Sequence, residues 1–182
     1  MHRNTIRTVF GFLRSVLQRR LPILRTRSAG VEQIYNYRKI PGVYSTSGQP
    51  NEAQLQQIVH SGFDQIINLA PNSVLENAVV NEAEILQQLG ARYTHLPIDF
   101  TNPTDADFDR FVALVRDAPA DRLWVHCAAN MRVSTFTYRY RRDVLGEDEA
   151  QARADLQAIW EPTGPWKPFL RRDADTGSPP AS

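Results

Sequence analysis

The segment His126–Arg132 (His-Cys-Ala-Ala-Asn-Met-Arg) combines residue types that can bind an anion and attack it. Cys127 is the only cysteine of the chain, and a cysteine thiolate is a strong nucleophile. Arg132 can bind two oxygens of a phosphate group at once. Ser134 follows on the next helical turn and could assist release of a thiolate leaving group. These residue types predict nucleophilic chemistry at a bound phosphate.

The backbone between Cys127 and Arg132 is suited to hold that anion. Ala128 and Ala129 are small enough for close approach, and Asn130 is one of the few non-glycine residues that tolerate a positive φ. Amides of residues 128–131 that turn inward at a helix N-terminus favour a bound anion and a thiolate. His126 could orient the loop through backbone hydrogen bonds. The alternative is that Cys127 is merely a small buried apolar residue at a strand end.

Alternating strand and helix patterns surround this segment. Apolar or alternating runs predict strands at 43–46, 65–69, 93–96 and 122–126, with helical spacing between them. This order predicts an α/β fold, with a mostly parallel central sheet of about four to five strands and helices on both faces. Ligands bind such sheets at the carboxyl ends of the strands, which is where Cys127 falls.

Local signals define several helix ends and a basic cluster. Asn81 with Glu84 predicts one capping pair, and Thr104 predicts the start of the next helix. Arg139, Arg141 and Arg142 follow the cysteine loop. We expect them on a solvated helix face, with attraction of phosphorylated substrates as the alternative. The tryptophans at 160 and 166 are expected to cap the core.

Charge divides the chain into unequal parts. Residues 1–29 contain seven arginines and no acid, which leaves 14 basic against 20 acidic residues in 30–182. We predict a basic amphipathic extension at 1–30, an α/β domain at 31–172 and a disordered tail at 173–182. The acidic domain argues against nucleic acid as a partner. The basic segment predicts either peripheral contact with an anionic membrane or an extension without that role.

The cysteine count and histidine spacing limit cofactors and compartment. One cysteine allows no intramolecular disulfide, which favours a reducing cytoplasm, with a position peripheral to the inner membrane as a further expectation. The four histidines show no metal-ligand spacing, so no metal and no other cofactor is predicted.

Val125-His126-Cys127 with Arg132 and Ser134 resembles the active-site loop of cysteine-dependent phosphatases, particularly the bacterial dual-specificity-like group. The resemblance covers about residues 31–170 and includes the stretches 46–50, 67–69 and 96–99. It implies a cysteinyl-phosphate intermediate without a metal. It also implies Cys127 as nucleophile, Arg132 as phosphate clamp and Ser134 as helper in phosphoenzyme breakdown.

The resemblance further implies a general acid in the loop after the third predicted strand. Asp99 is the leading candidate, and Asp105 and Asp107 are alternatives whose other role would be to stabilise a helix N-terminus. The substrate would be a phosphorylated protein or a small phosphomonoester. The sequence predicts no particular oligomeric state.

The spacing between cysteine and arginine departs from the family pattern. The family loop has five intervening residues, whereas this chain has four, and an ungapped alignment puts Val133 in the arginine's place. Two alternatives follow from this departure. One is a catalytically weak or inactive protein that binds phosphate or phosphoproteins. The other is a rhodanese-like sulfurtransferase, which uses a tighter loop and would carry a persulfide on Cys127.

Overall fold

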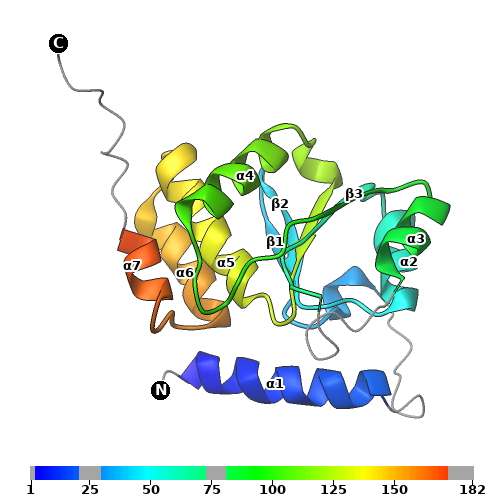
Figure 1. The fold of residues 1–182 in the computed structure, drawn as a ribbon, viewed down its shortest axis with the longest axis horizontal. Helices are drawn as coiled ribbons and strands as arrows, with labels where there is room; N and C mark the ends of the chain where they lie inside the picture. The colour runs from blue at the N-terminus through cyan, green and yellow to red at the C-terminus, as the bar shows by residue number, and fades with distance from the viewer. Residues whose placement is uncertain (1–2, 21–29, 73–80, 172–182) are drawn as a thin grey trace.

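Hydrophobic patterning in the chain produces a five-stranded sheet with helices packed on both faces (Figure 1). The computed structural model describes residues 3–20, 30–72 and 81–171, so the predicted tail at 173–182 lies outside the described residues. The strands are β1 (Arg38–Ile40), β2 (Tyr44–Ser47), β3 (Gln65–Asn68), β4 (Arg92–His95) and β5 (Leu123–His126). The α-helices are α1 (Arg3–Arg20), α2 (Glu52–His60), α3 (Glu82–Gln88), α4 (Asp105–Arg116), α5 (Met131–Arg139), α6 (Glu149–Ile159) and α7 (Trp166–Arg171). Short 3-10 turns are η2 (Val31–Gln33) and η3 (Ala120–Arg122), and α5 continues into the π-helical η4 (Tyr140–Val144).

The sheet has the order β1-β2-β5-β3-β4, and β5 is its central strand. Strands β2, β5, β3 and β4 pair in parallel, while β1 pairs antiparallel with β2 at one edge. The predicted α/β fold with a mostly parallel sheet is confirmed. The sequence did not predict β1, because three residues are too few to show an alternating pattern.

Side chains of the central strands alternate between two hydrophobic cores. Ile66 and Trp124 pack against η2, α2 and α3 on one face. Ile67, Leu123 and Val125 point to the opposite face and pack against α4, α5, α6 and α7. This alternation follows from the two-residue period of a strand, and it confirms that helices cover both faces.

One of the two predicted helix caps is confirmed. Thr104 accepts a hydrogen bond from the amide of Asp107, and the carboxylate of Asp107 accepts one in return from the Thr104 amide. The predicted pair of Asn81 and Glu84 is wrong, since the Asn81 side chain makes no capping hydrogen bond. Asn81 has ψ 36°, outside the extended conformation that aims a capping side chain at the helix amides.

Helix α1 begins at residue 3 and lies along one end of the molecule, apart from the sheet (Figure 1). It contacts α6, so part of the predicted extension is packed against the domain. Among the described residues, no helix is both long enough and apolar enough to cross a membrane.

Candidate active site

The cysteine loop leaves the carboxyl end of the central strand and leads into α5. The Cys127 amide donates to the Ser47 carbonyl of β2 at 3.3 Å, and the Gln49 amide donates to the Ala128 carbonyl at 3.1 Å. Strands β2 and β3 pair with β5 on either side, so the loop starts from a strand held on both edges. Cys127 itself is fully buried. The position predicted for the cysteine from the strand–helix order is therefore observed.

Asn130 forms the turn between the loop and α5. Its φ is 64°, in the left-handed region, as its residue type suggested. The Asn130 side-chain amide donates to the Asn36 carbonyl at 2.8 Å and to Oγ1 of Thr46 at 3.0 Å. The Asn36 side chain in turn donates to the Ala129 carbonyl at 3.0 Å. These bonds fix the left-handed turn from outside the loop.

The loop amides are available to an anion. Within the described part of the chain, the N–H groups of residues 128–131 donate to no backbone or side-chain acceptor. They lie at the start of α5, where the helix dipole favours negative charge. Successive amides without an internal partner next to a cysteine are what a phosphate-binding loop requires.

Arg132 is buried, and its side chain contacts the segment that follows β4. Its Nε donates to the Ile98 carbonyl at 2.9 Å, and its guanidinium carbon lies 5.0 Å from the centre of the Phe100 ring. The side chain is only 3% exposed. The arginine thus reaches from α5 to the loop that carries Asp99, despite the short spacing from Cys127.

Asp99 lies on that loop and is exposed. Its carboxylate accepts hydrogen bonds from both the amide and the hydroxyl of Thr101, each at 2.8 Å. These two bonds, together with the charge of Arg132, hold the pKa of Asp99 below its ordinary value. Asp99 is therefore ionised in the resting protein, whereas a general acid must carry a proton when it acts.

The two alternative acids are engaged at the start of α4. Asp107 closes the capping box with Thr104, and Asp105 forms an ion pair with Arg139 at 2.8 Å. Asp107 therefore stabilises this helix end, as one interpretation had it, whereas Asp105 lies in the first turn but pairs with α5. The identity of the general acid stays a prediction.

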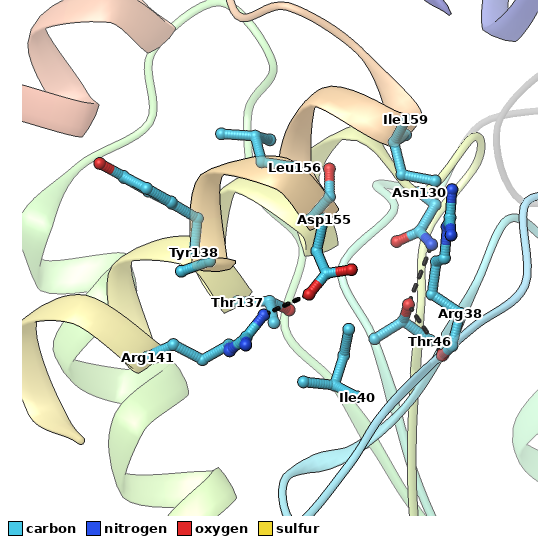
Figure 2. Close-up of a pocket in the computed structure, with 12 residues that line it drawn as sticks. Arg38, Ile40, Thr46, Asn130, Thr137, Tyr138, Arg141, Asp155, Leu156 and Ile159 are labelled. Carbon is cyan, nitrogen blue, oxygen red and sulfur yellow. Dashed lines mark hydrogen bonds and ion pairs between the residues drawn. The ribbon is translucent and has the colours of Figure 1, made fainter. Parts of the chain in front are cut away.

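Ser134 lies in the first turn of α5. Its hydroxyl donates to the Met131 carbonyl at 3.1 Å. With Asn130 it lines a small pocket between the β1–β2 edge and helices α5 and α6. Figure 2 shows Asn130 and Thr46 on one side of this pocket and the Arg141–Asp155 ion pair on the other. The role of Ser134 at the sulfur stays a prediction.

His126 is joined to a buried carboxylate that the sequence analysis missed. Its Nε2 lies 2.8 Å from Oε1 of Glu82, and both side chains are at most 2% exposed. The Glu82 carboxylate also accepts hydrogen bonds from Nδ2 of Asn68 at 2.9 Å and from the Tyr93 hydroxyl at 3.3 Å. The only local signal was that Glu82 stands four residues before buried Leu86, on the inward face of α3.

Burial alone would raise the pKa of Glu82. The charge of His126 and the hydrogen bonds from His126, Tyr93 and Asn68 outweigh that effect, and the net pKa is below its ordinary value. The buried carboxylate of Glu82 is therefore negatively charged and contacts His126, the residue before Cys127.

The arginines after the loop are not a solvated face. Arg139 pairs with Asp105 and with Asp143, and Arg141 pairs with Glu147 and Asp155. The side chains of Arg139 and Arg141 are 6% and 4% exposed. The predicted solvated face is wrong for Arg139 and Arg141, because both side chains are buried and paired with acids. The alternative, attraction of phosphorylated substrates, stays a prediction.

The two tryptophans at the C-terminal end of the domain are buried in the core, as expected. They also contact the site. Nε1 of Trp160 donates to the Met131 carbonyl at 3.1 Å, and Nε1 of Trp166 donates to the Phe100 carbonyl at 2.9 Å. The two indoles thus tie the helical end of the cysteine loop and the Asp99 loop to the same core. Among the described residues, no three histidine, cysteine, aspartate or glutamate side chains gather as metal ligands would.

A central parallel strand, a cysteine at its carboxyl end and an arginine in the following helix define the class of the cysteine-dependent phosphatases. The family model described as "DSP-PTPase phosphatase fused to NAD+ Kinase" matches residues 30–163, and the chain belongs to this family. A curated relative, the Beta-lactamase hydrolase-like protein of Xylella fastidiosa, is 32% identical over 88 residues. That alignment covers 47% of this chain and only 20% of the relative's length.

Solved structures show the same fold. A DUF442 phosphatase candidate from Shewanella putrefaciens superposes with a TM-score of 0.64 at 27% identity, over 77% of this chain and 91% of that chain. TpbA of P. aeruginosa, in a variant bound to phosphotyrosine, superposes with a TM-score of 0.54 at 18% identity, over 72% of this chain and 76% of that chain. The second likeness shows the fold alone.

Proposed function

We propose that this protein hydrolyses a phosphomonoester through a cysteinyl-phosphate intermediate. The observation that carries the proposal is the loop itself. Cys127 ends the central strand, Asn130 turns the chain at φ 64°, and the amides of residues 128–131 have no acceptor within the described chain. Membership of a phosphatase family supports phosphoryl transfer over sulfur transfer.

The reaction proceeds in two displacements. The Cys127 thiolate attacks phosphorus, the P–O bond to the leaving group breaks, and the leaving oxygen takes a proton from a general acid. Water then attacks the phosphorus of the cysteinyl phosphate, the P–S bond breaks, and Cys127 leaves as the thiolate, while the two protons of the water stay with the inorganic phosphate that departs. Ser134 assists this second step by hydrogen bonding to the departing sulfur. The loop amides and Arg132 stabilise the charge on the phosphoryl oxygens in both steps.

Asp99 is the proposed general acid. It is the acid on the loop that Arg132 contacts, and Asp105 and Asp107 are bound at the start of α4. An incoming phosphate dianion raises the proton affinity of a nearby carboxylate, which opposes the lowering by Thr101 and Arg132. Substrate binding would therefore help Asp99 to become protonated.

A second candidate function is phosphate or phosphoprotein binding without turnover. Two observations favour it: the Nε of Arg132 is bound to the Ile98 carbonyl, and Asp99 is held as an anion by Thr101. In that case the loop would bind the phosphate group while the clamp and the acid were unsuited to cleavage.

Turnover of p-nitrophenyl phosphate, measured with the full chain and with Cys127→Ser, tests the proposal. We expect turnover by the wild type and none by the variant, with both folded by circular dichroism. Absent turnover together with vanadate binding by the wild type would favour the binding protein. Release of thiocyanate from thiosulfate and cyanide, lost in Cys127→Ser, would favour the sulfurtransferase and contradict the phosphatase.

A phosphorylated protein or a small phosphomonoester is the proposed substrate class. The phosphotyrosine complex of TpbA supports testing phosphoproteins as substrates. The mechanism requires a reduced Cys127, so we propose a reducing compartment, the cytoplasm, as the place of action.

A further inference from the structure

Helix α1 binds the domain through its polar face. The Asn4 side chain donates to the Gln157 carbonyl at 2.9 Å, and the Thr8 hydroxyl donates to the Ile159 carbonyl at 2.5 Å. Arg7 donates to the Ala158 carbonyl at 3.1 Å. These three carbonyls end α6 and have no partner within that helix. Side chains of α1 therefore cap the C-terminus of α6.

Further contacts extend the same docked face. Thr5 accepts a hydrogen bond from the Glu161 amide at 2.8 Å, and the Tyr35 hydroxyl donates to the Thr8 carbonyl. Gly11 lets the Tyr35 ring approach the helix, since a Cβ there would lie 2.7 Å from the ring. Thr5 and Thr8 are buried, at 7% and 1% exposure. The orientation of α1 is thus set by several bonds along residues 4–11.

The opposite face of α1 is apolar and exposed. Phe10 is 68% exposed, Leu13 57%, Val9 38% and Ile6 37%. These residues recur at helical spacing, as in the face that an amphipathic helix normally buries. Here the usual arrangement is inverted, with polar side chains inward and apolar side chains outward. Of the five large hydrophobic side chains exposed in the described chain, four belong to this face.

The positive charge of the segment that carries this face bears on which partner the face can bind. Arg3 and Arg14 are exposed on the same helix, and residues 1–29 contain seven arginines without an acid. A second copy docked face to face would bring these like charges together. An anionic lipid surface would instead accept the apolar side chains and attract the arginines.

We propose that α1 binds an anionic bilayer surface through Ile6, Val9, Phe10 and Leu13 while its polar face stays bonded to α6. The remainder of the chain has about six net negative charges, which an anionic surface repels. Contact is therefore confined to α1, and the domain takes one orientation on the membrane.

That orientation brings the cysteine loop to the membrane side. The Asn36 side chain lies 3.4 Å from the Thr8 hydroxyl and donates to the Ala129 carbonyl of the loop. Figure 1 shows α1 below the end of the sheet from which α5 starts. The helix and the loop therefore share one end of the molecule.

Co-sedimentation of the full chain with lipid vesicles tests the proposal. We expect binding to mixed phosphatidylglycerol–phosphatidylcholine vesicles and at least about tenfold weaker binding of Phe10→Gln/Leu13→Gln. Arg14→Gln would weaken binding about fivefold, and added salt would weaken it further. Leu145→Gln is the matched control, because Leu145 is an exposed apolar residue outside α1 and its loss should leave binding unchanged.

Three results would overturn the proposal. The first is no binding of the wild type to the anionic vesicles. The second is equal binding to vesicles of phosphatidylcholine alone. The third is a dimer in light scattering that Phe10→Gln/Leu13→Gln dissociates, which would assign the face to a second copy. Circular dichroism of each variant confirms that the fold is intact, since none of these side chains takes part in the bonds to α6.

Discussion

The Asp99 carboxylate has two states that matter at the scale of single residues: an anion at rest and a proton donor in the proposed reaction. Bonds from Thr101 and the nearby Arg132 favour the anion. The position of Asp99 was predicted from the chain, but its hydrogen bonds were not. The contribution of Asp99 to the rate of hydrolysis should therefore depend on how strongly the leaving group needs a proton.

Asp99→Asn is expected to slow hydrolysis of phenyl phosphate about 100-fold and that of p-nitrophenyl phosphate much less, because only the poorer leaving group needs the proton. The wild type's advantage for phenyl phosphate should grow as pH falls from about 7 to about 5, since the lowered pKa leaves little acid form at neutral pH. Steady-state kinetics check this. Asp121→Asn, at the opposite end of β5, is the control, and equal losses with both substrates would exclude Asp99 as the acid.

Glu82→Gln is expected to destabilise the fold by about 3 kcal/mol, because it leaves a buried His126 without its charged partner. The pKa of Glu82 is lowered in the folded state, so its contribution is complete above the ordinary carboxyl pKa and is lost as pH falls through the lowered value. Urea unfolding at several pH values measures both effects. Glu84→Gln, exposed on the same helix, should change stability little. If Glu82→Gln lost as much unfolding free energy at acid pH as the wild type does, the loss could not be assigned to protonation of Glu82.

At the scale of elements, side chains of α1 stabilise α6 by capping its C-terminal carbonyl groups. Thr8→Val keeps the shape of the side chain but removes the donor to the Ile159 carbonyl, and we expect a loss of about 1–2 kcal/mol in free energy of unfolding. Val9→Thr makes the reverse change on the exposed face and should cost almost nothing. If both substitutions had the same effect in urea unfolding, the polar docking of α1 would be wrong.

Elements with strong local patterns were predicted from the sequence. The strand that ends at His126, the left-handed Asn130 and the Thr104 cap follow from short-range rules. Strand β1 was missed because it is short and its pairing with β2 is what makes it a strand. The docking of α1 on α6 was not predicted for another reason. Apolar periodicity normally marks the face that a helix packs against its domain, whereas α1 packs through its polar face and leaves the apolar face exposed.

Pairings between distant parts of the chain could not be predicted. Arg139 finds Asp105 from α4, Arg141 finds Asp155 from α6, and His126 finds Glu82 from α3. A single sequence gives the residue types but not which acid meets which base. The same limit applies to Trp160, whose bond to the Met131 carbonyl links the last part of the domain to the loop.

At the scale of the whole molecule, an anion in the loop should stabilise the entire domain, because only the folded chain has the site. Vanadate at about 100 times its Kd is expected to add about 2.7 kcal/mol and to raise the Tm by about 5–10 °C. Calorimetry measures the shift. Arg132→Ala should reduce it strongly, whereas Arg116→Ala, exposed at the end of α4, should retain it. An unchanged shift in Arg132→Ala would remove Arg132 from the phosphate site.

The central place of β5 has a consequence for how the protein opens. Its partners β2 and β3 lie far from it in the sequence, so the strand that positions Cys127 forms only when these non-local pairings are complete. Amides of β5 should then exchange with deuterium only through global unfolding, whereas those of the edge strand β1 exchange through smaller openings. Partial unfolding at the sheet edge would then leave the strand that positions Cys127 in place, so the site would persist through openings that separate β1 from the sheet.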